Sequence, residues 1–346
     1  MIKLIDKLEK QNWLSESEYK LLIENSENPK LREYLFERAV AVRKSVYKNA
    51  VFVRGLIEFT NYCKNNCYYC GIRAGNKNAQ RYRLSKQQIL ECCEKGYKAG
   101  FRTFVLQGGE DLYFTKEAIS DIVSSIKNNH PDVAVTLSFG EHPRETYQEW
   151  FDAGADRYLL RHETADSGHY SLLHPQNLTL ENRMRCLKDL KEIGYQVGCG
   201  FMVGSPYQTA SHIAKDLCFI QSFKPHMVGI GPFIPHCDTP FASEKSGSVN
   251  LTLFLLAIVR LILPNVLLPA TTALGTAKQN GRELGILAGA NVCMPNLSPT
   301  DVREKYTLYN NKLTSGAECL EQFEKLRELM QNIGYEVVVS RGDCKN

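Results

Sequence analysis

Residues 51–70, VFVRGLIEFTNYCKNNCYYC, place an apolar run directly before three closely spaced cysteines. The run at 51–59 is rich in β-branched and aromatic residues, which predicts a buried strand. Cys63, Cys67 and Cys70 follow at a CxxxCxxC spacing, on the loop that leads to the next helix. In parallel α/β folds such loops form the face that carries ligand sites. The stretch therefore predicts a parallel α/β fold with a site after its first strand.

Strand-like and helix-like runs alternate eight times from about residue 51, which is typical of parallel βα units. We therefore expect an α/β fold, a complete (β/α)8 TIM-type barrel with an N-terminal helical extension. Its domains would be a helical cap at 1–48, the barrel at 49–300, and a loop and helix at 301–346 that complete it. The candidate strands are VFVRGLIEF, TFVLQ, VAVTLSF, DRYLLRH, QVGCGFMV, HMVGIGPF, VLLPATT and NVCMP.

Three further segments have sequence patterns that predict their structure. Leu4, Ile5 and Leu8 form a helical stripe in the extension, and Ser15 is a candidate N-cap for the next helix. The apolar run 251–270 is broken by Arg260 and Pro264, so it predicts a helix, a turn and a strand and not a membrane span. The weakly patterned stretch 296–315 is expected to be a loop over one end of the barrel.

Composition narrows the classes of function. Hydrophobic residues make up 43% and charged residues 23% of the 346 residues, and the net charge is +4. This balance predicts a globular chain with no bias toward nucleic acid or a membrane surface. The charged N-terminal segment has no apolar signal core, so we expect a cytoplasmic protein. In a reducing compartment the clustered cysteines among the 12 suggest metal ligands, and the scattered ones suggest core packing.

The CxxxCxxC spacing has a specific chemical meaning. Three thiolates can hold a four-iron cubane while one iron stays open for an exchangeable ligand. With 12 cysteines in 346 residues, this spacing is expected by chance on the order of 0.01 times. The alternative is a structural zinc ion with His142 or His162 as its fourth ligand.

Polar residues on the predicted strands can be assigned to faces by their parity. Arg157, Arg161 and Glu163 fall on one face of the fourth strand, and unpaired charges would be costly on the face that packs against helices. We therefore expect them to point inward. The same parity argument groups Thr136 with Ser138 on the third strand. On the first strand it groups Arg54, Glu58 and Thr60. Either a polar ligand cavity or a buried ion-pair network would explain such a barrel interior.

With the triad placed after the first strand, the sequence resembles the radical S-adenosylmethionine (SAM) superfamily. The resemblance implies that Cys63, Cys67 and Cys70 hold a [4Fe-4S] cluster whose open iron chelates SAM, which is cleaved to a 5′-deoxyadenosyl radical. It also implies that Tyr69 lies near the adenine. The segment Gln107, Gly108 and Gly109 would contact the amino group of SAM.

Longer strings are similar to the HydE type of [FeFe]-hydrogenase maturase, among them IEFTNYCKNNCYYCGIR, VLQGGEDLYF, ADRYLLRHETA and LPATTALGT. This resemblance implies that Glu163 holds the SAM ribose and that Arg183 pairs with the methionine carboxylate, with Ser138 nearby. The residues implied to line the substrate cavity are Thr136, Arg157, Thr271, Thr272 and Tyr306.

The same resemblance implies a function in building the hydrogenase active-site cluster. The substrate would be a small iron- and cysteine-containing precursor with carbon monoxide and cyanide ligands. Ferredoxin or flavodoxin would donate the electron, and other hydrogenase maturases would be possible partners. A second cluster near the C-terminus is not expected, because that region offers only Cys319, and Cys237 stands where proline is usual. The alternatives are a methylornithine-synthase-like radical SAM mutase and a non-catalytic iron-sulfur carrier or scaffold.

Overall fold

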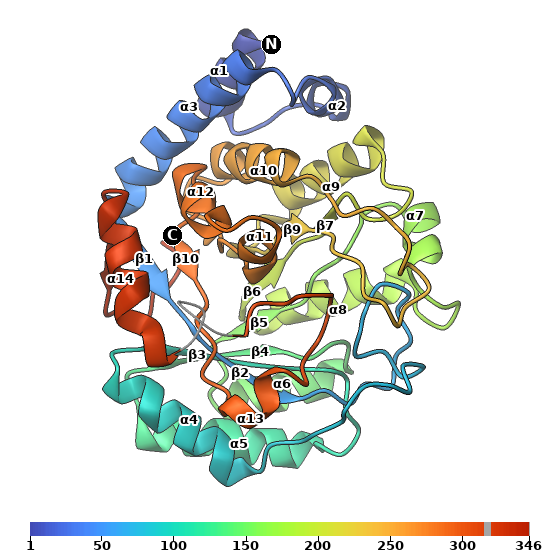
Figure 1. The fold of residues 1–346 in the computed structure, drawn as a ribbon, viewed down its shortest axis with the longest axis vertical. Helices are drawn as coiled ribbons and strands as arrows, with labels where there is room; N and C mark the ends of the chain where they lie inside the picture. Colours follow the sequence, from blue (N-terminus) through green and yellow to red (C-terminus); the bar gives the residue numbers. More distant parts are fainter. Residues whose placement is uncertain (315–319, 346) are drawn as a thin grey trace.

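Three helices precede the first strand in the computed structural model, which describes residues 1–314 and 320–345. They are α1 (Ile2–Gln11), α2 (Glu16–Glu24) and α3 (Pro29–Tyr47). Ser15 caps α2, because its side chain accepts from the Glu18 amide while the Glu18 carboxylate accepts from the Ser15 amide, as the sequence predicted. The three helices stand at one end of the molecule, where α2 contacts α9 (Ala210–Phe223) and α3 contacts α10 (Val249–Ile262) (Figure 1).

The strands form a parallel α/β arrangement, which confirms the α/β part of the predicted fold class. They are β1 (Ala50–Val53), β2 (Gly55–Thr60), β3 (Thr103–Gly108), β4 (Ala134–Ser138), β5 (Arg157–Leu159), β6 (Gln196–Cys199), β7 (Met202–Val203), β8 (Met227–Val228), β9 (Gly231–Pro232), β10 (Val292–Cys293) and β11 (Glu336–Val338). One sheet has the order β2-β3-β4-β5-β6-β8, a second has the order β10-β1-β11, and β7 pairs with β9. Every strand pair is parallel.

The run 266–272, predicted as a strand, is more irregular than expected. Leu267 makes an isolated parallel bridge to Met227, and Pro269 makes one to Val292. Proline has no amide hydrogen to donate to a ladder, and a helix already begins at Thr272. The segment therefore lies between β8 and β10 and makes one bridge to each of them without forming a regular strand.

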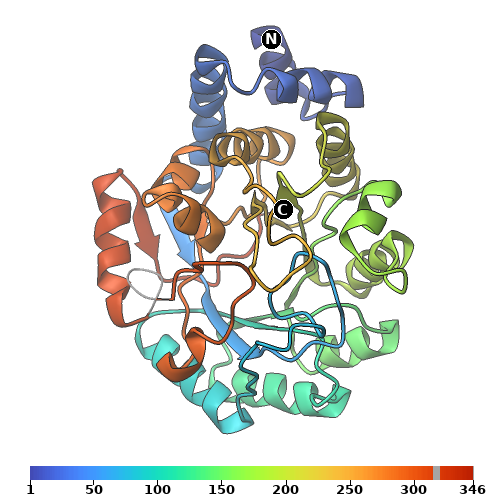
Figure 2. The same cartoon turned by 45° about the vertical axis from the view of Figure 1, so that its right-hand side comes forward.

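Helices follow the strands and cover the outside of the sheet (Figures 1 and 2). Serine or threonine side chains accept from the third amide of α4, α5, α8, α9 and α10, so the chain turns cleanly from each loop into a helix. The helices are α4 (Lys86–Lys98), α5 (Lys116–Asn129), α6 (Arg144–Asp152), α7 (Ser167–Leu173), α8 (Leu180–Ile193), α9 (Ala210–Phe223), α10 (Val249–Ile262), α11 (Thr272–Ala277), α12 (Gly281–Leu287), α13 (Thr300–Arg303) and α14 (Phe323–Asn332), with a 3-10 turn at Leu320–Gln322.

The apolar run that begins at 251 is the buried helix α10, followed by a turn, as expected. Among the described residues, no helix combines the length and the hydropathy needed to cross a lipid bilayer.

The strand β11 and the residues after it were not foreseen from the sequence. Strand β11 pairs with β1, and the following segment runs beneath the amino ends of the central strands. There the Asp343 carboxylate accepts from Arg157 Nη2 at 2.6 Å and from Gln196 Nε2 at 2.9 Å. Arg157 is fully buried and also donates to Thr103 Oγ1 and to the Arg341 carbonyl. The segment therefore supplies the counter-charge of a buried arginine.

We expect Asp343→Ala to lower the free energy of unfolding by about 2 kcal/mol, because Arg157 would remain buried without a counter-charge. Burial alone would raise the pKa of Asp343, but Arg157 and Arg341 lower it from 3.8 to about 2. The stabilisation is thus complete above about pH 4 and disappears as pH falls through about 2. Urea unfolding of both proteins at pH 7 and pH 3 measures this difference. Asp132→Ala, which removes an exposed partner of Arg102, should change stability little.

Candidate functional site

A chamber of about 360 Å³ lies at the carboxyl ends of the strands. Its walls come from β2, β3, β4, β9, the loop after β5, helix α8 and the loop after α13. It brings together nearly all the predicted site residues, which are Cys63, Cys67, Cys70, Tyr69, Gln107, Gly108, Gly109, Ser138, Glu163, Arg183, Thr271, Thr272 and Tyr306. The sequence-predicted loop at 296–315 also contributes to it, through Tyr306, Leu308, Tyr309 and Lys312.

Two predicted substrate residues do not line this chamber. Thr136 lines a second, much smaller cavity of about 20 Å³ deeper in the interior, together with Arg54 and Met227. Arg157 lines neither cavity, because its guanidinium points toward Thr103 and Asp343 at the opposite end of the strands. Arg157 points inward as expected, but it forms an ion pair with Asp343 below the chamber and does not reach the chamber wall.

The loop that carries the three cysteines is held by hydrogen bonds to its own backbone and to neighbouring loops. Asn61 Nδ2 donates to the carbonyls of Gln80 and Lys305 at 2.8 and 2.7 Å. Arg81 donates to four backbone carbonyls within the same loop. The Lys64 amide donates to the Glu110 carbonyl at 2.9 Å. The cysteines are therefore presented on a fixed frame, which prearranges a ligand set.

The three cysteines are partly buried, and the surrounding protein desolvates their thiols. Burial raises the pKa of Cys63, Cys67 and Cys70, the last to about 12. Neighbouring cysteines raise the pKa of Cys67 and Cys70 further. At neutral pH the metal-free thiols are thus protonated, and metal binding must release protons.

The zinc alternative can be compared with the arrangement of the triad. Sulfurs bound to one zinc at 2.3 Å lie about 3.8 Å apart. Among the described residues, His236, Cys237 and Asp238 bring three metal-ligand atoms within 4.8 Å of one another, and the triad does not meet this criterion, so its sulfurs are not gathered as around one zinc ion. The histidines of the zinc alternative are also occupied. His142 Nε2 lies 3.3 Å from the Phe139 carbonyl, and His162 Nε2 lies 3.3 Å from Asp216 Oδ1. The residues present fit a multinuclear cluster.

The glycines after β3 allow a close approach of two loops. A Cβ built at Gly109 would lie 2.2 Å from the Tyr62 carbonyl oxygen and 2.7 Å from Cys63 Cβ. Both contacts are far shorter than van der Waals distances, so only glycine fits at this position against the cysteine loop.

Gly109→Ala is therefore expected to displace the cysteine loop and to lower the iron content after anaerobic reconstitution. Iron analysis and the cluster absorbance measure the effect. Gly168→Ala is the matched control, because a Cβ on this helical glycine would meet only Asp166 Oδ1, at 3.3 Å. Equal iron content in the two variants would contradict the packing argument.

Arg183 is a buried residue on α8 and faces the chamber. Its Nε donates to Glu141 Oε1, and its Nη1 donates to the Arg161 carbonyl at 2.6 Å. Burial would lower its pKa, but Tyr170, Glu141 and Tyr69 keep the pKa above its usual value. A permanently charged guanidinium thus lies in the chamber wall, which suits recognition of a carboxylate.

Glu163 reaches the chamber because the backbone turns sharply after β5. It adopts a left-handed φ of 64°, and its amide donates to the Gly200 carbonyl at 3.0 Å. Arg161 Nη2 lies 3.0 Å from Glu163 Oε2. His162 points to the outside instead, toward Asp216 on α9. The predicted separation of the two faces is therefore correct for these residues.

Other predicted residues of the chamber wall make hydrogen bonds to neighbouring side chains. Tyr69 lies next to His174, with 3.0 Å between its hydroxyl oxygen and Nε2. Gln107 Nε2 donates to the Tyr306 hydroxyl at 3.4 Å, which links β3 to the loop after α13. The side chains of Cys92, Cys93, Cys199 and Cys293 are buried, as predicted. Cys319 lies outside the described residues.

Sequence reasoning missed Glu141 as the partner of Arg183 and Lys312 as a chamber residue. Glu141 follows Ser138 closely and stands in the string VTLSFGE, which could have pointed to it. Lys312 lies in a stretch without periodicity, where nothing in the sequence marks a buried side chain.

Comparison with known proteins bears on this site. The profile of the radical SAM superfamily matches residues 57–220. The [FeFe] hydrogenase maturase subunit HydE of Thermotoga maritima is 45% identical over 331 residues, 95% of this chain and 94% of that protein. The 3-methylornithine synthase of Methanosarcina acetivorans is 31% identical over 290 residues, 83% of this chain and 81% of that protein. A crystal structure of methylornithine synthase (PylB) superposes with a TM-score of 0.86 and 26% identity, covering 97% of each chain.

Proposed function

Because the chain belongs to the radical SAM superfamily and is a maturase of the HydE type, we propose that Cys63, Cys67 and Cys70 hold a [4Fe-4S] cluster with SAM on its fourth iron. When bound and reduced, this pair supplies a 5′-deoxyadenosyl radical. The observation that carries the proposal is that three partly buried cysteines from one loop line a chamber that also holds separate acidic and basic groups.

The chamber residues would divide the binding of SAM among them. Arg183, charged and buried, would receive the methionine carboxylate, with Ser138 nearby. Glu163 would accept the ribose hydroxyls, Tyr69 would lie against the adenine, and the backbone at Gln107, Gly108 and Gly109 would contact the amino group. The support is that all these residues line one chamber. Several of them are fixed there by hydrogen bonds to neighbouring loops.

The substrate would be a small iron- and cysteine-containing precursor of the [FeFe]-hydrogenase active-site cluster. Thr271, Thr272 and Tyr306 would line its binding site, with Thr136 and Arg157 beneath. Within the chamber, the walls of strands and loops would limit the access of water and other hydrogen donors to a reactive radical. The electron would come from a small carrier such as ferredoxin or flavodoxin in the cytoplasm, and other hydrogenase maturases would be partners in the same assembly.

The sheet itself would be a complete (β/α)8 barrel at 49–300, with the cap at 1–48 and the segment 301–346 completing it. The proposal is supported by the isolated parallel bridges of Leu267 to Met227 and of Pro269 to Val292, and by the pairing of Val292 with Phe52 on β1. These contacts lead from β8 to β1, and Leu56 on β2 makes an isolated parallel bridge to Asn296 after β10, as a closed barrel would require.

The test is anaerobic reconstitution followed by dithionite and SAM, with electron paramagnetic resonance and product analysis. We expect a cubane signal that changes when SAM is added, and formation of deoxyadenosine or an adenosylated product. A cluster that binds no SAM would instead support an iron-sulfur carrier. Because the methylornithine synthases are also similar in sequence and structure, lysine is the second substrate to test. Deoxyadenosine coupled to methylornithine formation would overturn the maturase proposal.

A further inference from the structure

A buried ion pair in the chamber has no part in the functions described above. Lys312 Nζ lies 2.5 Å from Glu58 Oε1. The Lys312 side chain is 5% exposed and that of Glu58 is 0% exposed, and both residues line the chamber. Lys312 belongs to the loop after α13, whereas Glu58 lies on β2, the strand that leads into the cysteine loop.

Stability is a weak explanation for this pair. Moving two charges out of water costs several kcal/mol, and apolar residues of similar volume often replace such a pair without loss. The loop also has other attachments. Gly71 donates to the Leu308 carbonyl, the Cys237 amide donates to Asn310 Oδ1, and the Leu313 amide donates to Thr276 Oγ1. The ion pair is therefore not needed to fasten the loop.

The hydrogen-bonding capacity of the two partners is unequal. Both carboxylate oxygens of Glu58 are occupied, because Oε2 accepts from Asn296 Nδ2 at 2.8 Å. An ammonium carries three N–H donors, and within residues 1–314 and 320–345 the hydrogen bond found for Lys312 Nζ is the one to Glu58. The ring of Tyr306 lies 5.0 Å from Nζ and favours its positive charge. Glu58 thus fixes Lys312 while donors remain free to point into the chamber.

Two other groups of the chamber wall also lack acceptors. Thr271 Oγ1 and Arg161 Nε are buried without a hydrogen-bond partner in the described part of the chain, and both residues line the chamber. Buried donors normally have hydrogen-bond partners, so a ligand that offers acceptor atoms would satisfy the donors of Thr271 and Arg161. We infer that Lys312 is a substrate-binding residue whose ammonium, positioned by Glu58, binds an anionic group of the substrate. The inference rests on the proposed function and extends it by naming the charge that the substrate presents.

The test measures equilibrium binding of an iron(II) complex with carbon monoxide, cyanide and cysteine ligands to the oxidised, SAM-loaded holoenzyme. We expect Lys312→Met to weaken binding by about tenfold or more, the effect of losing a charged hydrogen bond, and Lys312→Arg to restore part of it. SAM affinity and the cluster signal should stay unchanged in both variants. Lys305→Met, on the same loop but absent from the chamber wall, is the matched control.

The double variant Glu58→Gln with Lys312→Met separates binding from structure, because it leaves no unpaired buried charge. If it binds the complex as tightly as the wild type, the inference is overturned and the pair is only structural. Repeating the series with cysteamine in place of cysteine identifies the anionic group. If Lys312→Met no longer weakens binding of the cysteamine complex, the group bound by Lys312 is the cysteine carboxylate. If Lys312→Met still weakens binding, the group is a cyanide ligand. Failure of the wild-type holoenzyme to bind either complex would overturn the proposed function as well.

Discussion

Replacing Cys67 with serine is expected to abolish the cubane signal and to reduce deoxyadenosine formation at least a hundredfold. Loss of an outer-shell partner of a metal ligand typically costs about 10-fold to 100-fold, and removal of a ligand itself should cost more. Among the residues that the structure describes, no other thiol lines the chamber and could replace Cys67. Iron content, the electron paramagnetic resonance spectrum and product analysis after anaerobic reconstitution measure the loss.

Cys237→Ser is the appropriate control for this variant. Cys237 is exposed and lies on a neighbouring loop, so its replacement tests general thiol damage near the chamber without touching the triad. Its iron content and SAM cleavage should equal those of the wild type. If Cys67→Ser retained a SAM-responsive cubane, another residue would have to serve as the third ligand.

Replacing Arg183 with methionine should weaken SAM binding by about 10-fold to 100-fold, since a charged hydrogen bond contributes about 1.5–3 kcal/mol. The iron content should be retained, because the cysteines keep their frame. Titration of the cluster signal with SAM gives the affinity. The change also leaves the buried Glu141 without its partner, which would lower stability by about 3 kcal/mol or more.

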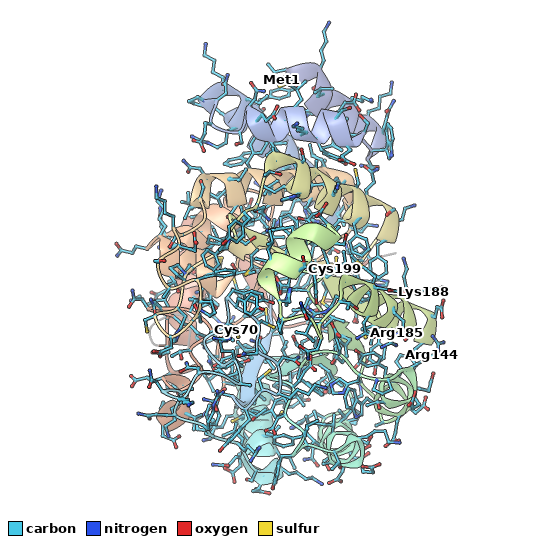
Figure 3. The ribbon with its side chains drawn as sticks, turned by 90° about the vertical axis from the view of Figure 1, so that its right-hand side faces the viewer. Met1, Cys70, Arg144, Arg185, Lys188 and Cys199 are labelled. Carbon is cyan, nitrogen blue, oxygen red and sulfur yellow. The ribbon has the colours of Figure 1, made fainter. Side chains whose placement is uncertain are left out.

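Two further variants separate these effects. Glu141→Gln combined with Arg183→Met leaves no unpaired buried charge, so it should recover stability but not SAM affinity. Arg185→Met changes an exposed arginine on the same helix that pairs with Asp189 and projects from the outer face of the molecule (Figure 3). It should behave as the wild type. Recovery of SAM affinity in the double variant would show that Arg183 acts only as the partner of Glu141.

Local patterns allowed much of this arrangement to be predicted. The continuous apolar run before Cys63 indicated a buried strand, and the triad that follows indicated a cluster site at its carboxyl end. Parity on the fourth strand placed Arg161 and Glu163 toward the chamber and His162 away from it, as the structure has them. The strand and the direction of these side chains are as predicted because each depends on residues that are close in sequence, whereas the cluster at the triad stays a prediction.

What could not be predicted depends on contacts between distant parts of the chain. Arg157 pairs with Asp343, and Glu58 with Lys312, and no periodic pattern connects either pair. Parity also cannot tell how deep a side chain lies along the strand axis, so Arg157 and Glu163 were grouped although they lie at different ends of the interior. The left-handed backbone at Glu163 is likewise set by its surroundings, since a glutamate has no local preference for it.

The pairing of β1 has a consequence for how the chain folds during synthesis. Strand β1 emerges from the ribosome early, but its two neighbours, β10 and β11, are among the segments made last. Until then its edges stay unpaired, and exposed strand edges favour association with other chains. The nascent protein therefore carries β1 without its partner strands through most of translation, and association through its edges should become unfavourable only when residues 292–338 have emerged.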